Sequence, residues 1–110
     1  MSNYQVNISG YQEPKKRLTT DETYKLIDEY QATKNEAVKD RLVNDNTKLV
    51  LSMARRFYGR EDCMDDLFQV GMIGLIKAIE NFNTSFGLKF STYAVPLIIG
   101  EMKRYLRDNH

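Results

Sequence analysis

The fold of this 110-residue chain is decided by two stretches, DLFQVGMIGL at residues 66–75 and FSTYAVP at residues 90–96. The first is an apolar helical sequence that carries one carboxylate, Asp66, and one amide, Gln69. Its two glycines lack side chains, so they predict the close approach of another backbone. The second stretch gathers aromatic and hydroxyl side chains at the start of a further helix, which ends in basic residues.

Around these stretches, apolar residues recur at helical spacing, and no segment shows the strict alternation of a half-buried strand. Thr19 and Glu22 form a capping box, which predicts the start of a helix. The other expected caps are Asn35, Asp62, and Ser91 or Thr92. The expected helices cover residues 20–33, 36–58, 63–81 and 92–107. The sequence therefore predicts an all-α fold, a compact bundle of about four helices.

The chain divides into a tail and a helical body. Residues 1–18 contain the basic run KKR and show little periodicity, so we interpret them as a mobile N-terminal tail. The helical domain is expected over residues 19–110. Within its second helix, the polar triplet NDN at residues 44–46 predicts an exposed face or a bend.

Length and composition indicate one soluble domain. Such a chain buries roughly 65% of its unfolded surface, and 42% of its residues are hydrophobic while 28% are charged. The single cysteine, Cys63, excludes an internal disulfide and suits a reducing cytosol, so a cytoplasmic location is expected. No apolar run reaches the roughly 18 residues of a membrane span, and no signal peptide opens the chain. We expect no contact with a membrane.

Catalytic chemistry is not expected. The only histidine, His110, is at the chain end, so no nucleophile and base pair can be built with Cys63. Acidic residues gather near the expected start of the third helix, where carboxylates favour the helix dipole. They lack the spacing of a calcium-binding loop. We therefore predict that the chain is not an enzyme and holds no metal or cofactor.

The C-terminal third has features that suit single-stranded DNA. Phe86, Phe90 and Tyr93 cluster beside Lys89. Aromatic rings stack on unpaired bases, each worth about 1–3 kcal/mol, and the hydroxyls and cations nearby can hold phosphates. The alternative is that Phe90 and Tyr93 are core residues at i, i+3 spacing, and taken alone the spacing favours that alternative.

A basic edge follows near the end of the last expected helix. Lys103, Arg104 and Arg107 lie at i, i+1 and i+4. Such a group can contact phosphates. It also complements the helix dipole, so a purely solvated face remains an equal alternative.

Taken together, residues 42–109 resemble region two of bacterial sigma factors, the subunits that direct RNA polymerase to promoters. The similarity rests on four motifs in the family's order and spacing: NTKLV at 46–50, DLFQVG at 66–71, IGL at 73–75 and KFSTYA at 89–94. The wording FSTYAVPLIIGE at 90–101 and RYLRDN at 104–109 is similar to the sporulation branch, and NISG at 7–10 to its late forespore-specific member.

The resemblance implies three sets of site residues. The helix face that binds the clamp coiled coil of core RNA polymerase is matched by Asp66, Leu67, Gln69 and Val70. The non-template strand of the promoter's minus-ten element is matched by Asn46, Lys48, Lys89, Phe90, Ser91, Thr92 and Tyr93. The upstream duplex edge of that element is matched by Gly100, Lys103 and Arg104, with Arg107 on the same basic edge.

The chain also departs from the family. Pro96 and Leu97 stand where housekeeping members have two adjacent tryptophans, which implies more promoter-restricted melting. The chain stops at His110, before the family's C-terminal helix-turn-helix. Two functions are therefore expected as alternatives. The first is a sporulation-type sigma domain that binds core polymerase and recognises and melts the minus-ten element. The second is a truncated interaction module that binds core polymerase or an anti-sigma protein without initiating transcription.

Overall fold

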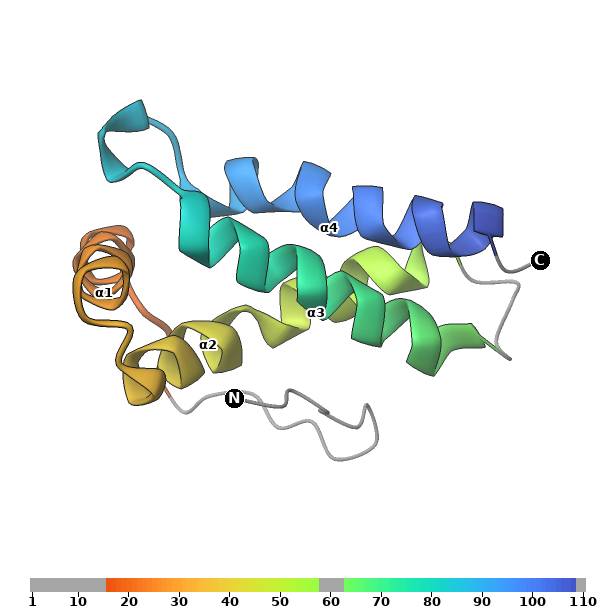
Figure 1. The fold of residues 1–110 in the computed structure, drawn as a ribbon, viewed down its shortest axis with the longest axis horizontal. Helices are drawn as coiled ribbons and strands as arrows, with labels where there is room; N and C mark the ends of the chain where they lie inside the picture. The colour runs from red at the N-terminus through yellow and green to blue at the C-terminus, as the bar shows by residue number, and fades with distance from the viewer. Residues whose placement is uncertain (1–15, 58–62, 109–110) are drawn as a thin grey trace.

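The computed structural model describes residues 16–57 and 63–108, and no strand occurs within these ranges. The elements are α1 (Thr20–Thr33), α2 (Glu36–Arg55), α3 (Met64–Asn81), the 3₁₀ helix η3 (Thr84–Phe86) and α4 (Phe90–Asp108). Figure 1 shows α3 and α4 running side by side in opposite directions, with α2 packed beneath them. α1 is seen end-on beside the C-terminal end of α3. The predicted all-α bundle of about four helices is confirmed.

The first two helices begin at the predicted caps. Thr19 Oγ1 accepts a hydrogen bond from the Glu22 N–H at 3.1 Å, and Glu22 Oε1 accepts one from the Thr19 N–H at 2.9 Å. The Asn35 side chain accepts from the Ala37 N–H at 2.8 Å. Each bond satisfies a backbone donor that has no partner within its own helix, and both caps are confirmed.

The predicted start of α4 is wrong by one or two residues. α4 begins at Phe90, so Ser91 and Thr92 lie inside its first turn instead of capping it. The reason is that the N–H groups of Thr92 and Tyr93 donate to the Lys89 carbonyl, at 3.1 and 3.4 Å. Lys89 is therefore the residue from which the helical hydrogen bonds start.

α2 is shorter than predicted. It ends at Arg55, and the Phe57 N–H then donates to the Ala54 carbonyl, three residues back, at 3.1 Å. This tighter bond pattern is common where an α-helix ends. The predicted end at residue 58 and the expected cap Asp62 lie outside the described residues.

Glycine sets the separation of α3 and α4, which form the most extensive helix pair. A Cβ at Gly74 would lie 2.5 Å from the Leu97 carbonyl oxygen and 2.7 Å from the Ile98 Cα. A Cβ at Gly71 would lie 2.5 Å from the Met102 side chain. The predicted close approach of another backbone at these glycines is confirmed.

One hydrophobic core lies between the helices. Its largest fully buried side chains are Ile27, Leu42, Val50, Leu67, Phe68, Met72, Leu75, Ile79, Phe82, Ile98 and Met102. They come from all four α-helices and from the residue that follows α3. Among the described helices, none combines the length and the apolar character needed to cross a membrane.

Polar contacts join α1 to the segment between α3 and α4. Gln31 Nε2 donates to the carbonyls of Ile79 and Phe82, at 3.1 and 2.7 Å. The Tyr24 hydroxyl donates to the Leu88 carbonyl at 2.7 Å. α1 therefore holds the segment that leads into α4.

The end of the predicted tail contacts α2. Leu18 is partly buried, and its N–H donates to Asp45 Oδ1 at 3.0 Å. Arg41 donates to the Lys16 carbonyl at 2.7 Å. Residues 1–15 lie outside the described residues, so the proposed division into tail and domain applies to them as a prediction only.

Candidate functional site

One side of α3 presents a partly exposed stripe, which we call the docking surface: Asp66, Gln69, Val70 and Ile73. Asp66 and Ile73 are exposed, and Gln69 and Val70 are half-buried. Ile73 is 47% exposed, which is unusual for isoleucine in a packed helix. The four positions follow i, i+3, i+4 and i+7 spacing, so they share one helical face. The stripe can pack against a helical partner.

Two expectations about this surface require correction. Leu67 is 0% exposed, because its position next to Asp66 turns it toward the core, so it supports the surface from beneath. Asp66 was expected to lack an intramolecular partner, yet Asp66 Oδ2 accepts a hydrogen bond from the Tyr105 hydroxyl at 2.9 Å. Asp66 therefore also links α3 to α4.

Phe82 is the centre of an aromatic cluster that contains Tyr24, Phe86, Phe90 and Tyr93. The ring centroids of these four residues lie 5.3–5.9 Å from that of Phe82. Phe90 is only 5% exposed and meets Phe82 edge to face, at 84°. The expectation that a base stacks on Phe90 is therefore wrong for this structure, because its ring faces are covered.

The outer part of the cluster offers ring surface to solvent. Phe86 is 50% exposed, and Tyr93 is half-buried. Their ring centroids are 6.0 Å apart. We call this pair the aromatic ledge, and it provides the exposed ring area that stacking on a base requires.

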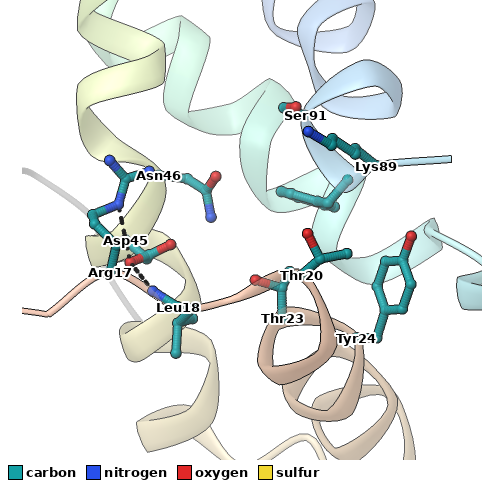
Figure 2. Close-up of a pocket in the computed structure, with 10 residues that line it drawn as sticks. Arg17, Leu18, Thr20, Thr23, Tyr24, Asp45, Asn46, Lys89 and Ser91 are labelled. Carbon is teal, nitrogen blue, oxygen red and sulfur yellow. Dashed lines mark hydrogen bonds and ion pairs between the residues drawn. The ribbon is translucent and has the colours of Figure 1, made fainter.

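A pocket of about 190 Å³ opens between the start of α1, the middle of α2 and the start of α4 (Figure 2). We call it the α1–α2–α4 pocket. Its lining residues are Arg17, Leu18, Thr20, Thr23, Tyr24, Asp45, Asn46, Lys89, Phe90 and Ser91. Of the predicted strand-binding residues, it brings together Asn46, Lys89, Phe90 and Ser91, whereas Lys48 and Thr92 are exposed outside it.

The wall that α2 contributes is buried and polar. The triplet at residues 44–46 was expected to be an exposed face or a bend, but Asp45 and Asn46 are only 5% and 8% exposed, and α2 continues through them. Asn46 Nδ2 donates to the Leu42 carbonyl at 2.8 Å. Asp45 is covered because its partners, Arg17 and the Leu18 N–H, come from the segment before α1.

The basic edge of α4 is largely paired. Arg104 Nη2 donates to Glu101 at 2.6 Å, and Arg107 Nε donates to Asp108 at 3.0 Å. Lys103 is exposed, and the structure shows no ion pair for it within the described residues. Gly100 is also exposed, and nothing lies within 4 Å of its ideal Cβ position. The edge therefore has less free positive charge than its sequence suggests.

Glu101 joins α3 to α4. Its carboxylate accepts hydrogen bonds from Lys77 Nζ at 2.8 Å and from Arg104, and its side chain is 14% exposed. The hydrogen bond from Lys77 holds the pKa of Glu101 below its ordinary value of 4.5; partial burial acts in the opposite direction, and Arg104 adds to the lowering.

Replacing Glu101 with glutamine is expected to lower the free energy of unfolding by about 1 kcal/mol near neutral pH, a small value because Lys77 and Arg104 are about half exposed. Since the folded pKa is depressed, this stabilisation is present above the unfolded pKa and is lost as the pH falls below 4.5. Denaturant unfolding at a series of pH values measures the effect, with Lys103→Gln as control. A pH-independent difference would contradict the assignment.

Metal or nucleophilic chemistry has no support in the described part of the chain. Within residues 16–57 and 63–108, no group of three His, Cys, Asp or Glu side chains could hold a metal ion. Cys63 is buried. His110 lies outside the described residues.

Several pocket and surface residues escaped the sequence analysis. Ile73 had a usable signal, because it follows Asp66 by seven positions and Val70 by three on one helical face. The pocket residues from the start of the chain had none, because their contacts to α2 are non-local. These residues are Arg17, Thr20, Thr23, Tyr24 and Asp45.

Comparison with known proteins gives this architecture a family. Residues 42–110 match the model for Sigma-70 region 2, and the chain belongs to that family. It is 50% identical to the RNA polymerase sigma-G factor of Bacillus subtilis (strain 168), over 100% of this chain and 43% of that protein. It is also 50% identical to a Bacillus thuringiensis subsp. kurstaki protein provisionally named an RNA polymerase sigma-G factor, over 100% of this chain and 88% of that protein.

A third relative is the RNA polymerase sigma-G factor of Clostridium acetobutylicum, 57% identical over 69% of this chain and 30% of that protein. This chain thus spans less than half the length of the Bacillus subtilis and Clostridium proteins. The resemblance to sigma region two is confirmed.

Proposed function

We propose that the chain acts in transcription initiation as region two of a sigma factor. It binds core RNA polymerase and captures unstacked bases of the non-template strand at the minus-ten element. The single observation that carries this proposal is the α1–α2–α4 pocket. It brings together Asn46, Lys89 and Ser91, which come from two helices and a loop far apart in the sequence and match the family's strand-binding positions.

The chemistry of the pocket suits one flipped base. Its volume of about 190 Å³ is below the roughly 300–1,000 Å³ of pockets for drug-sized ligands. Asn46 and the hydroxyls of Thr20, Thr23 and Ser91 supply hydrogen-bonding groups. Lys89 is exposed at the start of α4 and can meet a phosphate. We place the base from the downstream end of the captured strand here.

The aromatic ledge is the proposed stacking platform for a second, upstream base. Replacing Tyr93 with alanine should weaken capture of the non-template strand by polymerase-bound chain by about 1–3 kcal/mol, because a stacking surface is lost. Binding is measured with a strand carrying 2-aminopurine in the minus-ten element. Ser85→Ala, in the same exposed loop, is the control. Wild-type capture by a folded Tyr93→Ala variant would exclude the ledge as the platform.

The docking surface is the proposed contact for the clamp coiled coil of core polymerase. A helix face with an apolar centre and polar margins is a common way to pack against helical partners. Ile73 supplies the apolar centre, and Asp66 and Gln69 supply the polar margin.

Ile73→Ala should weaken binding to core polymerase by about 1–2 kcal/mol, since an exposed isoleucine becomes buried on docking, and should leave helical content unchanged. Asp66→Ala and Gln69→Ala should each cost about 1.5–3 kcal/mol of affinity. Tyr105→Phe is the matched control, because it removes the hydroxyl that binds Asp66 but leaves the carboxylate in place. If Tyr105→Phe weakens binding as much as Asp66→Ala, the role of Asp66 is to link α3 and α4.

The remaining parts of the proposal follow from the resemblance. Gly100, Lys103, Arg104 and Arg107 face the upstream duplex edge of the minus-ten element, with Lys103 as the main phosphate contact. The chain works in the cytoplasm by binding, without catalysis or cofactor, in a sporulation programme to which its likeness to sigma-G factors points. An anti-sigma protein is a further proposed partner.

A further inference from the structure

We propose that Asp45 determines which base the α1–α2–α4 pocket accepts, by offering a carboxylate oxygen to the exocyclic amino group of adenine or cytosine. This inference rests on the proposed capture of a non-template base in that pocket. It adds a specificity-determining residue at a position to which the family resemblance gives no role.

The first observation is a buried oxygen that faces the pocket. Asp45 is 5% exposed, and both of its contacts use Oδ1, which accepts from the Leu18 N–H at 3.0 Å and pairs with Arg17 Nε at 3.3 Å. Within residues 16–57 and 63–108, the structure gives Oδ2 no hydrogen-bond partner. Figure 2 shows this oxygen directed away from Arg17, toward the pocket. A buried carboxylate oxygen favours a donor, and a ligand can supply one.

The second observation is the distribution of charge. A carboxylate in the pocket wall repels phosphate, so a DNA strand has to enter with a base edge toward Asp45. Arg17 and Lys89 lie at the rim of the same pocket, and both are exposed. They can hold the phosphates on either side of the inserted base.

The third observation is a second acceptor beside the first. Asn46 uses Nδ2 to donate to the Leu42 carbonyl, which leaves its Oδ1 available as an acceptor in the same wall. An amino group offers two hydrogens and can satisfy both oxygens, as adenine and cytosine do when they are read by side-chain acceptors. Thymine offers one N–H between two carbonyls, which two acceptors would repel. The wall therefore favours an amino-bearing base.

The test uses the full chain bound to core RNA polymerase and non-template oligonucleotides that differ at the last base of the minus-ten element. That base is adenine, purine without the amino group, cytosine, 2-pyrimidinone, thymine or an abasic site. For wild type, removing the amino group should weaken binding roughly 10- to 100-fold, the value of a hydrogen bond to a charged group. The adenine and cytosine arms show which of the two bases fits.

Asp45→Asn can keep an acceptor for the Leu18 N–H but presents an NH₂ group where Oδ2 was. The preference for the amino-bearing base should fall to about one-fold, and thymine should gain. Arg17→Gln is the matched control, since it breaks the ion pair and leaves Asp45 in place, and it should retain the wild-type preference. Thermal unfolding of both variants establishes that they are folded.

The outcomes separate this inference from the proposed function. If the abasic strand binds weakly but Asp45→Asn keeps the wild-type base preference, the pocket holds a base and Asp45 only anchors Leu18, so the inference is wrong. If the abasic strand binds as well as the others, no base occupies the pocket, and both proposals are wrong. A preference that disappears in Asp45→Asn and persists in Arg17→Gln supports the inference.

Discussion

Replacing Phe90 with alanine is expected to lower the free energy of unfolding by about 3–5 kcal/mol, the usual cost of removing a buried phenylalanine side chain. Phe90 is 5% exposed and packs edge to face on Phe82, so its loss leaves a cavity where α4 begins. Denaturant unfolding followed by circular dichroism measures the change.

Phe86→Ala is the matched control for Phe90. It removes the same side chain from the same aromatic cluster at a position that is 50% exposed. It should cost about 1 kcal/mol or less. If Phe90→Ala instead keeps nearly wild-type stability and loses capture of the non-template strand, Phe90 contacts a base and its packing role is wrong.

Gly74→Val is expected to destabilise the domain by about 3 kcal/mol or more, at or above the usual upper range for overpacking. The added Cβ would lie 2.5 Å from the Leu97 carbonyl oxygen, and backbone cannot move aside as a flexible side chain can. α3 and α4 would have to separate, which disturbs the core and the link between Asp66 and Tyr105. Thermal and denaturant unfolding measure the loss.

Gly100→Ala is the control, because no atom lies within 4 Å of a Cβ at that position on α4. It should stabilise the helix by about 0.5–1 kcal/mol, since alanine is the better helix former. A Gly74→Val variant with wild-type stability would show that the two helices are not held together at this glycine.

Local sequence signals predicted most of the fold. The capping box at Thr19 and the cap at Asn35 identified two helix starts, because both depend on residues within three positions. The glycines of α3 predicted the close pairing with α4. The start of α4 was misplaced, since a backbone carbonyl accepts its first bonds and hydroxyl side chains only resemble caps there.

The candidate site was less predictable because it depends on direction and on distant contacts. Motif matching assigned Leu67 and Phe90 to binding, although both side chains turn into the core. Asp45 was taken for an exposed residue because its partner, the Leu18 N–H, is 27 positions away. Spacing along a helix gives no indication of such a contact, so the buried polar wall of the pocket emerged only from the structure.

The central claim is that the polymerase-bound chain captures one particular DNA strand. The most direct measurement compares the fluorescence of 2-aminopurine in non-template and template oligonucleotides of the minus-ten element, with core polymerase and with or without the chain. We predict that the chain confers preferential binding of the non-template strand, and that isolated chain binds duplex promoter DNA poorly, since a net charge of +1 displaces few counterions. Equal binding of both strands by a chain that is bound to polymerase would contradict the account and would favour an interaction module that does not initiate transcription.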